Sequence, residues 1–140
     1  MKTITVQSLA ISNTNPFVLI AGPCVLESRD HAMMMAENLT TLCNTLNIPL
    51  IYKTSFDKAN RTSITGARGL GLEASLKIFE EIRSTFNVPL TTDVHSPEQC
   101  AVVANSVDVL QIPAFLCRQT DLLQAAAKTG KVVNIKKGQF

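Results

Sequence analysis

Residues 53–61 (KTSFDKANR) concentrate side chains that bind anions. Lys53 ends an apolar run, and because burial of an unpaired ammonium is costly, it needs a carboxylate partner or an anionic ligand. Lys58 offers a compact charge, and Arg61 offers a forked donor that suits a phosphate. The alternative is an ordinary solvated loop, as most charged loops are.

A second pair of cations, Lys136 and Lys137, follows the apolar run at 132–135. Lysines at the ends of two different strands would meet at one edge of a sheet, where a phosphate or carboxylate substrate could bind. Alternatively, the two lysines form a solvated edge. Together with residues 53–61, this pattern favours a site for small anions.

Asp93 and His95 follow a third apolar run. A carboxylate at this place can position a hydroxyl group or a metal-bound water, and a histidine can shuttle a proton near neutral pH. The alternative is that both side chains only cap the next helix and satisfy loop N–H groups. We predict a functional role for Asp93 and leave the two interpretations of His95 open.

Five short runs rich in Val, Ile and Leu indicate buried parallel strands, at residues 17–21, 48–54, 88–92, 107–112 and 132–136. Apolar residues at helical spacing predict helices at residues 29–46, 72–86, 96–104 and 120–128. Ser28 and Ser96 are the expected N-caps of the first and third helices, and Gly130 is the expected C-cap of the fourth. We expect residues 3–11 to form a small hairpin or plug.

Alternating strands and helices require right-handed crossovers and therefore a parallel α/β fold. A doubly wound sheet or a closed barrel would satisfy this pattern. Polar residues fall at the carboxyl ends of the apolar runs, which favours a (β/α)₈ TIM barrel, because such barrels carry their chemistry on that ring of loops. A barrel needs eight strands and typically ~250 residues. We therefore expect residues 1–140 to supply about the first five strands, as the N-terminal part of a single barrel domain.

Composition excludes several classes of protein. The formal net charge is +2 and the basic residues are dispersed, which argues against a nucleic-acid partner. The apolar stretch at residues 17–22 is too short to cross a bilayer and has no signal-peptide flanks, so we expect no membrane association and a cytoplasmic location. The four cysteines lack the CxxC pairing of structural zinc sites and are expected to be reduced thiols.

Long motifs, in order along the chain, resemble the 3-deoxy-D-manno-octulosonate 8-phosphate synthase family. They are residues 22–30 (GPCVLESRD), 53–61 (KTSFDKANR), 92–95 (TDVH), 110–116 (LQIPAFL), 118–121 (RQTD) and 133–137 (VNIKK). The resemblance implies a TIM-barrel enzyme that condenses phosphoenolpyruvate with arabinose 5-phosphate. It also implies a cytoplasmic homotetramer that makes the inner-core sugar of lipopolysaccharide.

The resemblance also implies roles for individual residues. Phosphoenolpyruvate would contact Lys53, Ser55, Lys58, Gln111 and Lys136, with Ala114 lining its pocket. Arabinose 5-phosphate would contact Asn60 and Arg61, and Thr62 stands where the family often has Ser and keeps the hydroxyl group. We expect catalytic roles for Lys53, Lys58 and Asp93. Residues 64–68 (ITGAR) depart from the family pattern, so no substrate contact is assigned to them.

The resemblance implies that Cys24 is a metal ligand, because family members that work without metal carry Asn at this position. A thiolate suits zinc or ferrous iron, and manganese is a further candidate. One thiolate cannot hold a divalent ion, and the resemblance places a His, a Glu and an Asp in the other half of the barrel. The alternative is that Cys24 is a small packed side chain, as most lone cysteines are.

Two other functions compete with this one. The related 3-deoxy-D-arabino-heptulosonate 7-phosphate synthases share the chemistry and the barrel, but the KTSFDKANR run and the QIPAFL run followed by RQTD favour the octulosonate enzyme. A non-catalytic half barrel is the rival from another class, because a partial barrel leaves two unpaired strand edges. We expect the 140-residue chain by itself to lack synthase activity.

Overall fold

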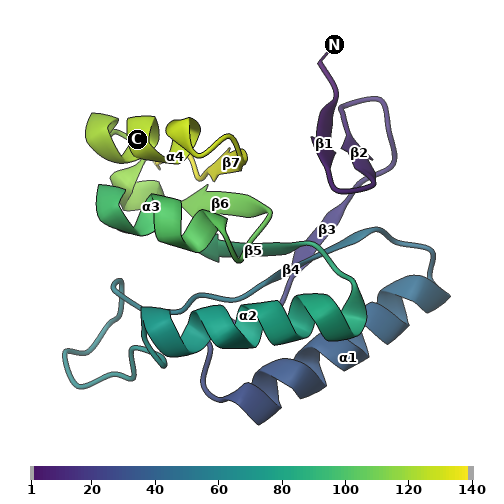
Figure 1. The fold of residues 1–140 in the computed structure, drawn as a ribbon, viewed down its shortest axis with the longest axis horizontal. Helices are drawn as coiled ribbons and strands as arrows, with labels where there is room; N and C mark the ends of the chain where they lie inside the picture. The colour runs from purple at the N-terminus through teal and green to yellow at the C-terminus, as the bar shows by residue number, and fades with distance from the viewer. Residues whose placement is uncertain (1, 139–140) are drawn as a thin grey trace.

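The computed structural model describes residues 2–138, which form a parallel sheet of five strands and a two-stranded hairpin (Figure 1). The sheet has the order β3-β4-β5-β6-β7, with strands Leu19–Ala21, Leu50–Lys53, Leu90–Asp93, Val109–Ile112 and Val132–Ile135. The hairpin pairs β1 (Ile4–Val6) with β2 (Leu9–Ile11) in antiparallel register. Each strand of the sheet is followed by the next in sequence, as in a curled part of a TIM barrel.

Helices connect the parallel strands in the described part of the chain. They are α1 (Arg29–Thr45), α2 (Leu72–Phe86), α3 (Pro97–Ala104) and α4 (Thr120–Lys128), with a short 3₁₀ helix, η1 (Ala114–Leu116), after β6. Figure 1 shows α1 beside α2 and α3 beside α4, and the helices of each pair contact one another. The predicted α/β fold, with the first strands of a barrel, is confirmed.

Local sequence signals set the helix ends. The Ser28 hydroxyl accepts a hydrogen bond from the N–H of His31, as an N-cap should. Asn87 ends α2 in the left-handed conformation, and its N–H donates to the Arg83 carbonyl. Gly130 follows α4 with a φ of +73°, so the predicted cap is confirmed. Ser96 occupies the N-cap position of α3 and Pro97 begins the helix, as predicted, but the Ser96 side chain makes no capping bond.

The two faces of the sheet contact different parts of the molecule, because side chains alternate between the faces along each strand. Leu50 and Tyr52 of β4 point into the main core, which the helices cover. Ile51 faces the other way and packs with Val109 of β6 and Val6 of the hairpin. Lys53 shares the face of Ile51, but it lies at the carboxyl end of the strand. The hairpin therefore covers one end of the face that carries Ile51, and polar residues occupy the other end of that face.

The predicted strands begin too early, and prolines explain the difference. Residues 48–54 and 88–92 were expected as strands, but β4 begins after Pro49 and β5 after Pro89. Proline has no N–H to donate to the ladder, although the carbonyls of both prolines still accept, from Leu19 and Tyr52 respectively. Asp93, in contrast, joins β5 because it pairs with Gln111 across the sheet.

The helical patterns are confirmed, except at the end of α1. Among the apolar residues at helical spacing in residues 29–46, Leu42 and Leu46 are 53% and 56% exposed. Within the described residues, α1 packs against α2 and β4, so only its narrow stripe of Ala32, Ala36 and Cys43 is fully covered. In residues 2–138 no helix combines the length and the apolar character that crossing a bilayer requires.

Candidate active site

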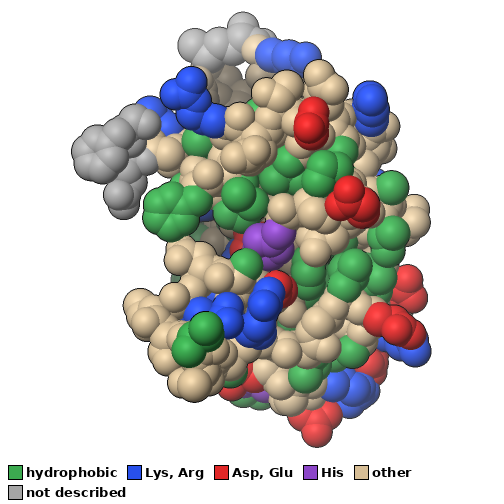
Figure 2. Space-filling view, turned by 90° about the vertical axis from the view of Figure 1, so that its left-hand side faces the viewer, with side chains coloured by type: hydrophobic (Ala, Val, Ile, Leu, Met, Phe, Trp, Pro, Cys, Tyr) green, Lys and Arg blue, Asp and Glu red, His purple; other side chains and the backbone are tan. Residues whose placement is uncertain are grey.

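A cavity of about 730 Å³ opens at the carboxyl end of the parallel strands. Its lining comes from the carboxyl ends of β4, β5 and β6 and from the segments that follow β4, β5, β6 and β7: Lys53, Asp57, Lys58, Ala59, Asn60, Asp93, His95, Gln111, Pro113, Ala114, Phe115, Leu116, Lys136 and Lys137. Figure 2 shows Lys and Arg side chains above and below the middle of one face, where a His side chain is visible. This is the edge at which barrel enzymes carry their sites.

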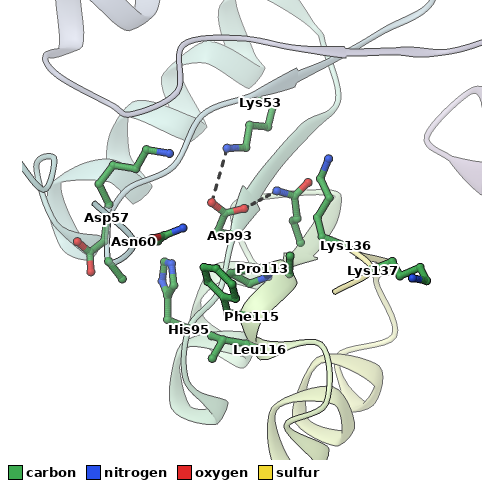
Figure 3. Close-up of a pocket in the computed structure, with 14 residues that line it drawn as sticks. Lys53, Asp57, Asn60, Asp93, His95, Pro113, Phe115, Leu116, Lys136 and Lys137 are labelled. Carbon is green, nitrogen blue, oxygen red and sulfur yellow. Dashed lines mark hydrogen bonds and ion pairs between the residues drawn. The ribbon is translucent and has the colours of Figure 1, made fainter. Parts of the chain in front are cut away.

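Lys53 and Asp93 form the centre of the cavity wall (Figure 3). The Lys53 ammonium donates to the Ser55 hydroxyl at 2.7 Å and lies 3.6 Å from Asp93 Oδ2. The Ser55 hydroxyl in turn donates to the same Oδ2 atom at 2.6 Å. Both charged side chains are mostly buried, so the pairing satisfies the need for a partner that the sequence predicted for Lys53.

The Asp93 carboxylate is also held by the neighbouring strand β6, on the side away from β4. Gln111 Nε2 donates to Asp93 Oδ1 at 2.6 Å, and Asn134 Nδ2 donates to Gln111 Oε1 at 2.9 Å. This row follows directly from strand register, because Asp93 pairs with Gln111 and Gln111 pairs with Asn134 across β5, β6 and β7. Side chains at paired positions share one face and are close enough to bond.

The loop after β3 passes directly over the backbone of Lys53. A Cβ atom placed on Gly22 would lie 1.8 Å from the Lys53 carbonyl oxygen, so only glycine permits this approach. The same loop is tied to the next residues of the site, since the Leu26 N–H donates to the Ser55 carbonyl at 2.9 Å. The position of Lys53 therefore depends on a residue outside the cavity.

The loop from 57 to 71 carries Lys58 and Asn60 to the cavity. Arg68 closes its base with two bonds to the Asp57 carboxylate, at 2.8 Å and 2.5 Å, while the Lys58 N–H donates to the Arg68 carbonyl at 2.6 Å. The hydrogen bond from Arg68 lowers the pKa of Asp57, against the opposing effect of burial. The ion pair fixes where the loop leaves the sheet.

The charges that line the cavity favour an anionic ligand. Four lysines face two carboxylates, and each carboxylate already has a cationic partner: Lys53 for Asp93, and Arg68, which stands outside the lining, for Asp57. Lys58, Lys136 and Lys137 have no carboxylate partner among the described residues. Because a concave site concentrates the field of such charges, it attracts small anions such as phosphates and carboxylates.

His95 lines the cavity next to Asp93 and Asp57. Its ring stacks edge-on against Phe56, with centroids 5.7 Å apart, and its Nδ1 atom is buried with no hydrogen-bond partner in residues 2–138. Burial lowers the pKa of His95, although the two nearby carboxylates oppose that shift. A neutral imidazole in this position can accept or donate a proton at the cavity wall.

The structure brings most of the predicted site residues together. Lys53, Lys58, Asn60, Asp93, Gln111, Ala114 and Lys136 all line the cavity. Ser55 does not, because its side chain is fully buried behind Lys53, where it bridges that ammonium to Asp93. Thr62 lies exposed on the loop, outside the lining.

Arg61 is also outside the cavity lining. Its guanidinium donates to the carbonyls of Lys58 and Ala59, both at 3.5 Å, and of Ile64 at 3.3 Å. These bonds are longer than the usual range of about 2.7–3.2 Å and involve neutral acceptors. The side chain is therefore folded back onto its own loop in this structure.

Two polar residues in or next to the cavity wall, Asp57 and Asn134, receive no role from the sequence alone. Asp57 was passed over as part of a charged loop, although it pairs with Arg68 and lines the cavity. Asn134 belongs to the motif at residues 133–137, but the sequence alone assigns it no contact. Its signal was its spacing, because Asn134 precedes Lys136 by two residues and so shares its face of the strand.

Cys24 is exposed on the loop after β3, at the same end of the sheet as the cavity, but it does not line it. In residues 2–138 no three His, Cys, Asp or Glu side chains come together in a way that could hold a metal ion. By themselves, the described residues therefore do not form a metal site.

Comparison with known proteins adds a family and a set of relatives. The model of the DAHP synthetase I family matches residues 2–140. A protein named 2-dehydro-3-deoxyphosphooctonate aldolase from Rickettsia bellii is 64% identical over 139 residues, which are 99% of this chain and 51% of the relative. Proteins of the same name from Rickettsia typhi and Rickettsia canadensis are 61% and 60% identical over the same shares. The chain spans about half the length of the curated relatives it matches.

Proposed function

Because this chain belongs to the DAHP synthetase I family, we propose that the full-length protein that contains it condenses phosphoenolpyruvate with arabinose 5-phosphate. The products are 3-deoxy-D-manno-octulosonate 8-phosphate and phosphate, for the inner core of lipopolysaccharide. One observation carries the proposal: four lysines and a paired carboxylate meet in one cavity at the carboxyl edge of a parallel sheet, in a chain 59–64% identical to proteins named for this reaction. A cytoplasmic homotetramer is part of the same proposal.

The reaction joins two anions, and the cavity is suited to that problem. C3 of phosphoenolpyruvate attacks the sugar aldehyde, water adds at C2, and phosphate leaves with cleavage of its C–O bond. Lys53, Lys58 and Lys136 hold the carboxylate and phosphate of phosphoenolpyruvate, so the repulsion between the substrates is offset and their orientation is fixed. Gln111 contributes its amide, and Ala114 lines the pocket. No Schiff base to lysine is required.

Asp93 and Ser55 act mainly by holding other groups. The carboxylate accepts from Ser55 and Gln111 and lies beside Lys53, so it fixes the two side chains that meet phosphoenolpyruvate. Ser55 is buried beneath Lys53, and its hydroxyl orients the ammonium. His95 stands at the same wall as a neutral group that can accept a proton from the water that attacks C2.

Asn60, Arg61 and Thr62 form the proposed contact with arabinose 5-phosphate. Asn60 already lines the cavity. The present partners of Arg61 are three neutral carbonyls at 3.3–3.5 Å, whereas a phosphate would give shorter, charge-assisted and bidentate bonds. The sugar phosphate therefore draws the guanidinium from its loop to the ligand.

The phosphate contact can be tested with Arg61→Ala in the full-length protein. We expect the transition-state free energy for arabinose 5-phosphate to rise by about 2–4 kcal/mol, near the ~2–5 lost when one partner of a desolvated charge pair is removed. The response to phosphoenolpyruvate should change less. Arg29→Ala, which removes an exposed arginine of α1, is the matched control. An equal loss for both substrates would remove Arg61 from the sugar site.

Carbon count separates the octulosonate enzyme from the related heptulosonate enzyme. Phosphoenolpyruvate supplies three carbons, so an eight-carbon product needs a five-carbon aldose phosphate and a seven-carbon product needs a four-carbon one. The full-length protein should turn over arabinose 5-phosphate in preference to a four-carbon aldose phosphate, measured as phosphate release. The opposite preference would make it a heptulosonate synthase. No release with either sugar would favour the non-catalytic alternative.

We also propose that Cys24 supplies one ligand to a divalent metal in the full-length protein, with zinc, iron and manganese as candidates. Its exposed thiol lies at the carboxyl edge of the sheet, the same edge as the cavity, and a thiolate suits the softer ions. The other ligands would come from residues beyond those of this chain. When bound, the metal would supply Lewis-acid chemistry that orients the aldehyde or the water.

A further inference from the structure

Asn134 lies next to Gln111, on the side away from Asp93. It does not line the cavity, yet its Nδ2 atom donates to Gln111 Oε1 at 2.9 Å. The two ends of a primary amide are alike in shape and opposite in hydrogen bonding, so its neighbours decide which end faces where. A carboxylate only accepts hydrogen bonds, and Gln111 therefore turns its NH₂ group to Asp93 and its oxygen to Asn134.

We infer that Asn134 is a positioning residue for the reaction: it locks the orientation of the Gln111 amide and, through it, the Asp93 carboxylate and the Lys53 ammonium. The inference rests on the proposed function. Without a donor at position 134, nothing else among the described residues bonds to Gln111 Oε1. The amide is then free to rotate, and Asp93 loses the donor on Oδ1 that balances Ser55 on Oδ2.

The decisive feature is the direction of the bonds, which an introduced carboxyl group can reverse. Asn134→Asp keeps the shape of the side chain but replaces its NH₂ donor with an acceptor when the carboxyl is ionised. Protonation of that carboxyl restores a donor. The introduced carboxyl faces the acceptor Gln111 Oε1, which favours its protonated form and raises its pKa. Asp93 on β5, bonded to the same amide, acts in the same direction, and the cations Lys53 on β4 and Lys136 after β7 act in the opposite one. The remaining titratable groups around the cavity are Asp57, Lys58, His95 and Lys137.

The test uses the full-length protein and compares Asn134→Asp and Asn134→Leu with the parent enzyme. At alkaline pH both variants should lose activity on the order of tenfold, the scale set by leaving a buried acceptor unsatisfied. The loss should appear in kcat and in the KM for phosphoenolpyruvate, while the KM for arabinose 5-phosphate stays near that of the parent. Asn105→Asp, an exposed change after α3, is the matched control and should leave activity unchanged.

Dependence on pH separates positioning from simple damage to the fold. Relative to the parent, the activity of Asn134→Asp should recover as pH falls through the pKa of the introduced carboxyl, while Asn134→Leu should show no recovery. An Asn134→Leu enzyme with parental kinetics, or an Asn134→Asp enzyme whose relative activity does not respond to pH, would overturn the inference.

A second readout does not depend on catalysis. If the carboxyl introduced by Asn134→Asp faces Gln111 Oε1, its folded pKa is raised, and the variant should be less stable than the parent above that pKa and regain stability as pH falls through it. Thermal unfolding measures this directly, with Asn105→Asp as the control. If this pattern holds but the parent enzyme makes no octulosonate, the proposed function fails while the lock on Gln111 stands. Without the pattern, the lock itself is refuted.

Discussion

Gly22→Ala should damage the site from outside the cavity. The φ of Gly22 is not in the left-handed region, so alanine can adopt its backbone conformation and the obstacle is only space. The new Cβ would lie 1.8 Å from the Lys53 carbonyl oxygen, and real Cβ contacts do not come closer than about 3.0 Å. One of the two backbones must retreat by at least about 1.2 Å. The Lys53 backbone is held by its pairing with Thr91 of β5, so the shift strains the sheet where it carries the ammonium.

Two effects of different size follow from that shift. Overpacking of this kind typically costs about 1–3 kcal/mol of unfolding free energy. A displacement of about 1 Å at a reacting group can lower activity roughly 10²-fold. We therefore expect kcat/KM of the full-length protein to fall by about two orders of magnitude, while the protein stays folded below its lowered melting temperature.

Gly130→Ala provides the matched control for Gly22→Ala. Gly130 has a φ of +73° and open space around it, and it lies at the other end of the sheet from the cavity. Alanine there should cost about 1–2 kcal/mol of stability through backbone strain alone, with kcat/KM per folded molecule unchanged. Denaturant unfolding and steady-state kinetics on both variants make the comparison. If Gly22→Ala retained parental kcat/KM, the argument that this contact positions Lys53 would be refuted.

Three further predictions concern charge and metal. Arg68→Ala should raise the pKa of Asp57. The variant should be less stable than the parent above the unfolded pKa of about 3.8, and this difference should vanish as pH falls through the lowered folded pKa of Asp57 in the parent. Thermal unfolding across the acid range measures the difference. Because the pKa of His95 is lowered, the unfolded state binds the proton more readily, and the parent loses stability as pH falls below about 6.5. His95→Gln should flatten this dependence of the unfolding free energy on pH, measured by denaturant unfolding. An unchanged dependence would contradict the assignment. Cys24→Asn should sharply lower the metal content of the full-length protein by elemental analysis, while Cys117→Ala should not; equal metal content in the two variants would return Cys24 to an ordinary side chain.

The order and type of the elements could be predicted from the sequence because each rests on a local signal. The helix at Leu72–Phe86 has both ends where the sequence predicts them, and its C-terminal end is marked by Asn87, which favours the left-handed conformation that ends a helix. Strand starts were less accurate, because an apolar run does not show which residues enter the ladder. Pro49 and Pro89 belong to such runs, but they cannot donate to a neighbouring strand.

The site was predictable to the extent that strand ends determine it. Lys53, Asp93 and Gln111 follow from where three strands stop, and their convergence requires only a parallel sheet. The orientation of Arg61 could not be predicted, because it depends on how an irregular loop folds back on its own carbonyls. The contact between Gly22 and Lys53 was equally hidden, since it joins residues 31 positions apart through backbone atoms alone.

The hydrogen bonds around Asp93 run toward it from both sides. From one side Lys53 donates to Ser55 and Ser55 to the carboxylate; from the other, Asn134 donates to Gln111 and Gln111 to the carboxylate. Such a row is a dead end for proton conduction, since the amides of Asn134 and Gln111 cannot relay a proton and both arms stop at the same acceptor. Among the described residues a proton therefore has no path along this row, and the open cavity, with His95 at its wall, is the remaining route.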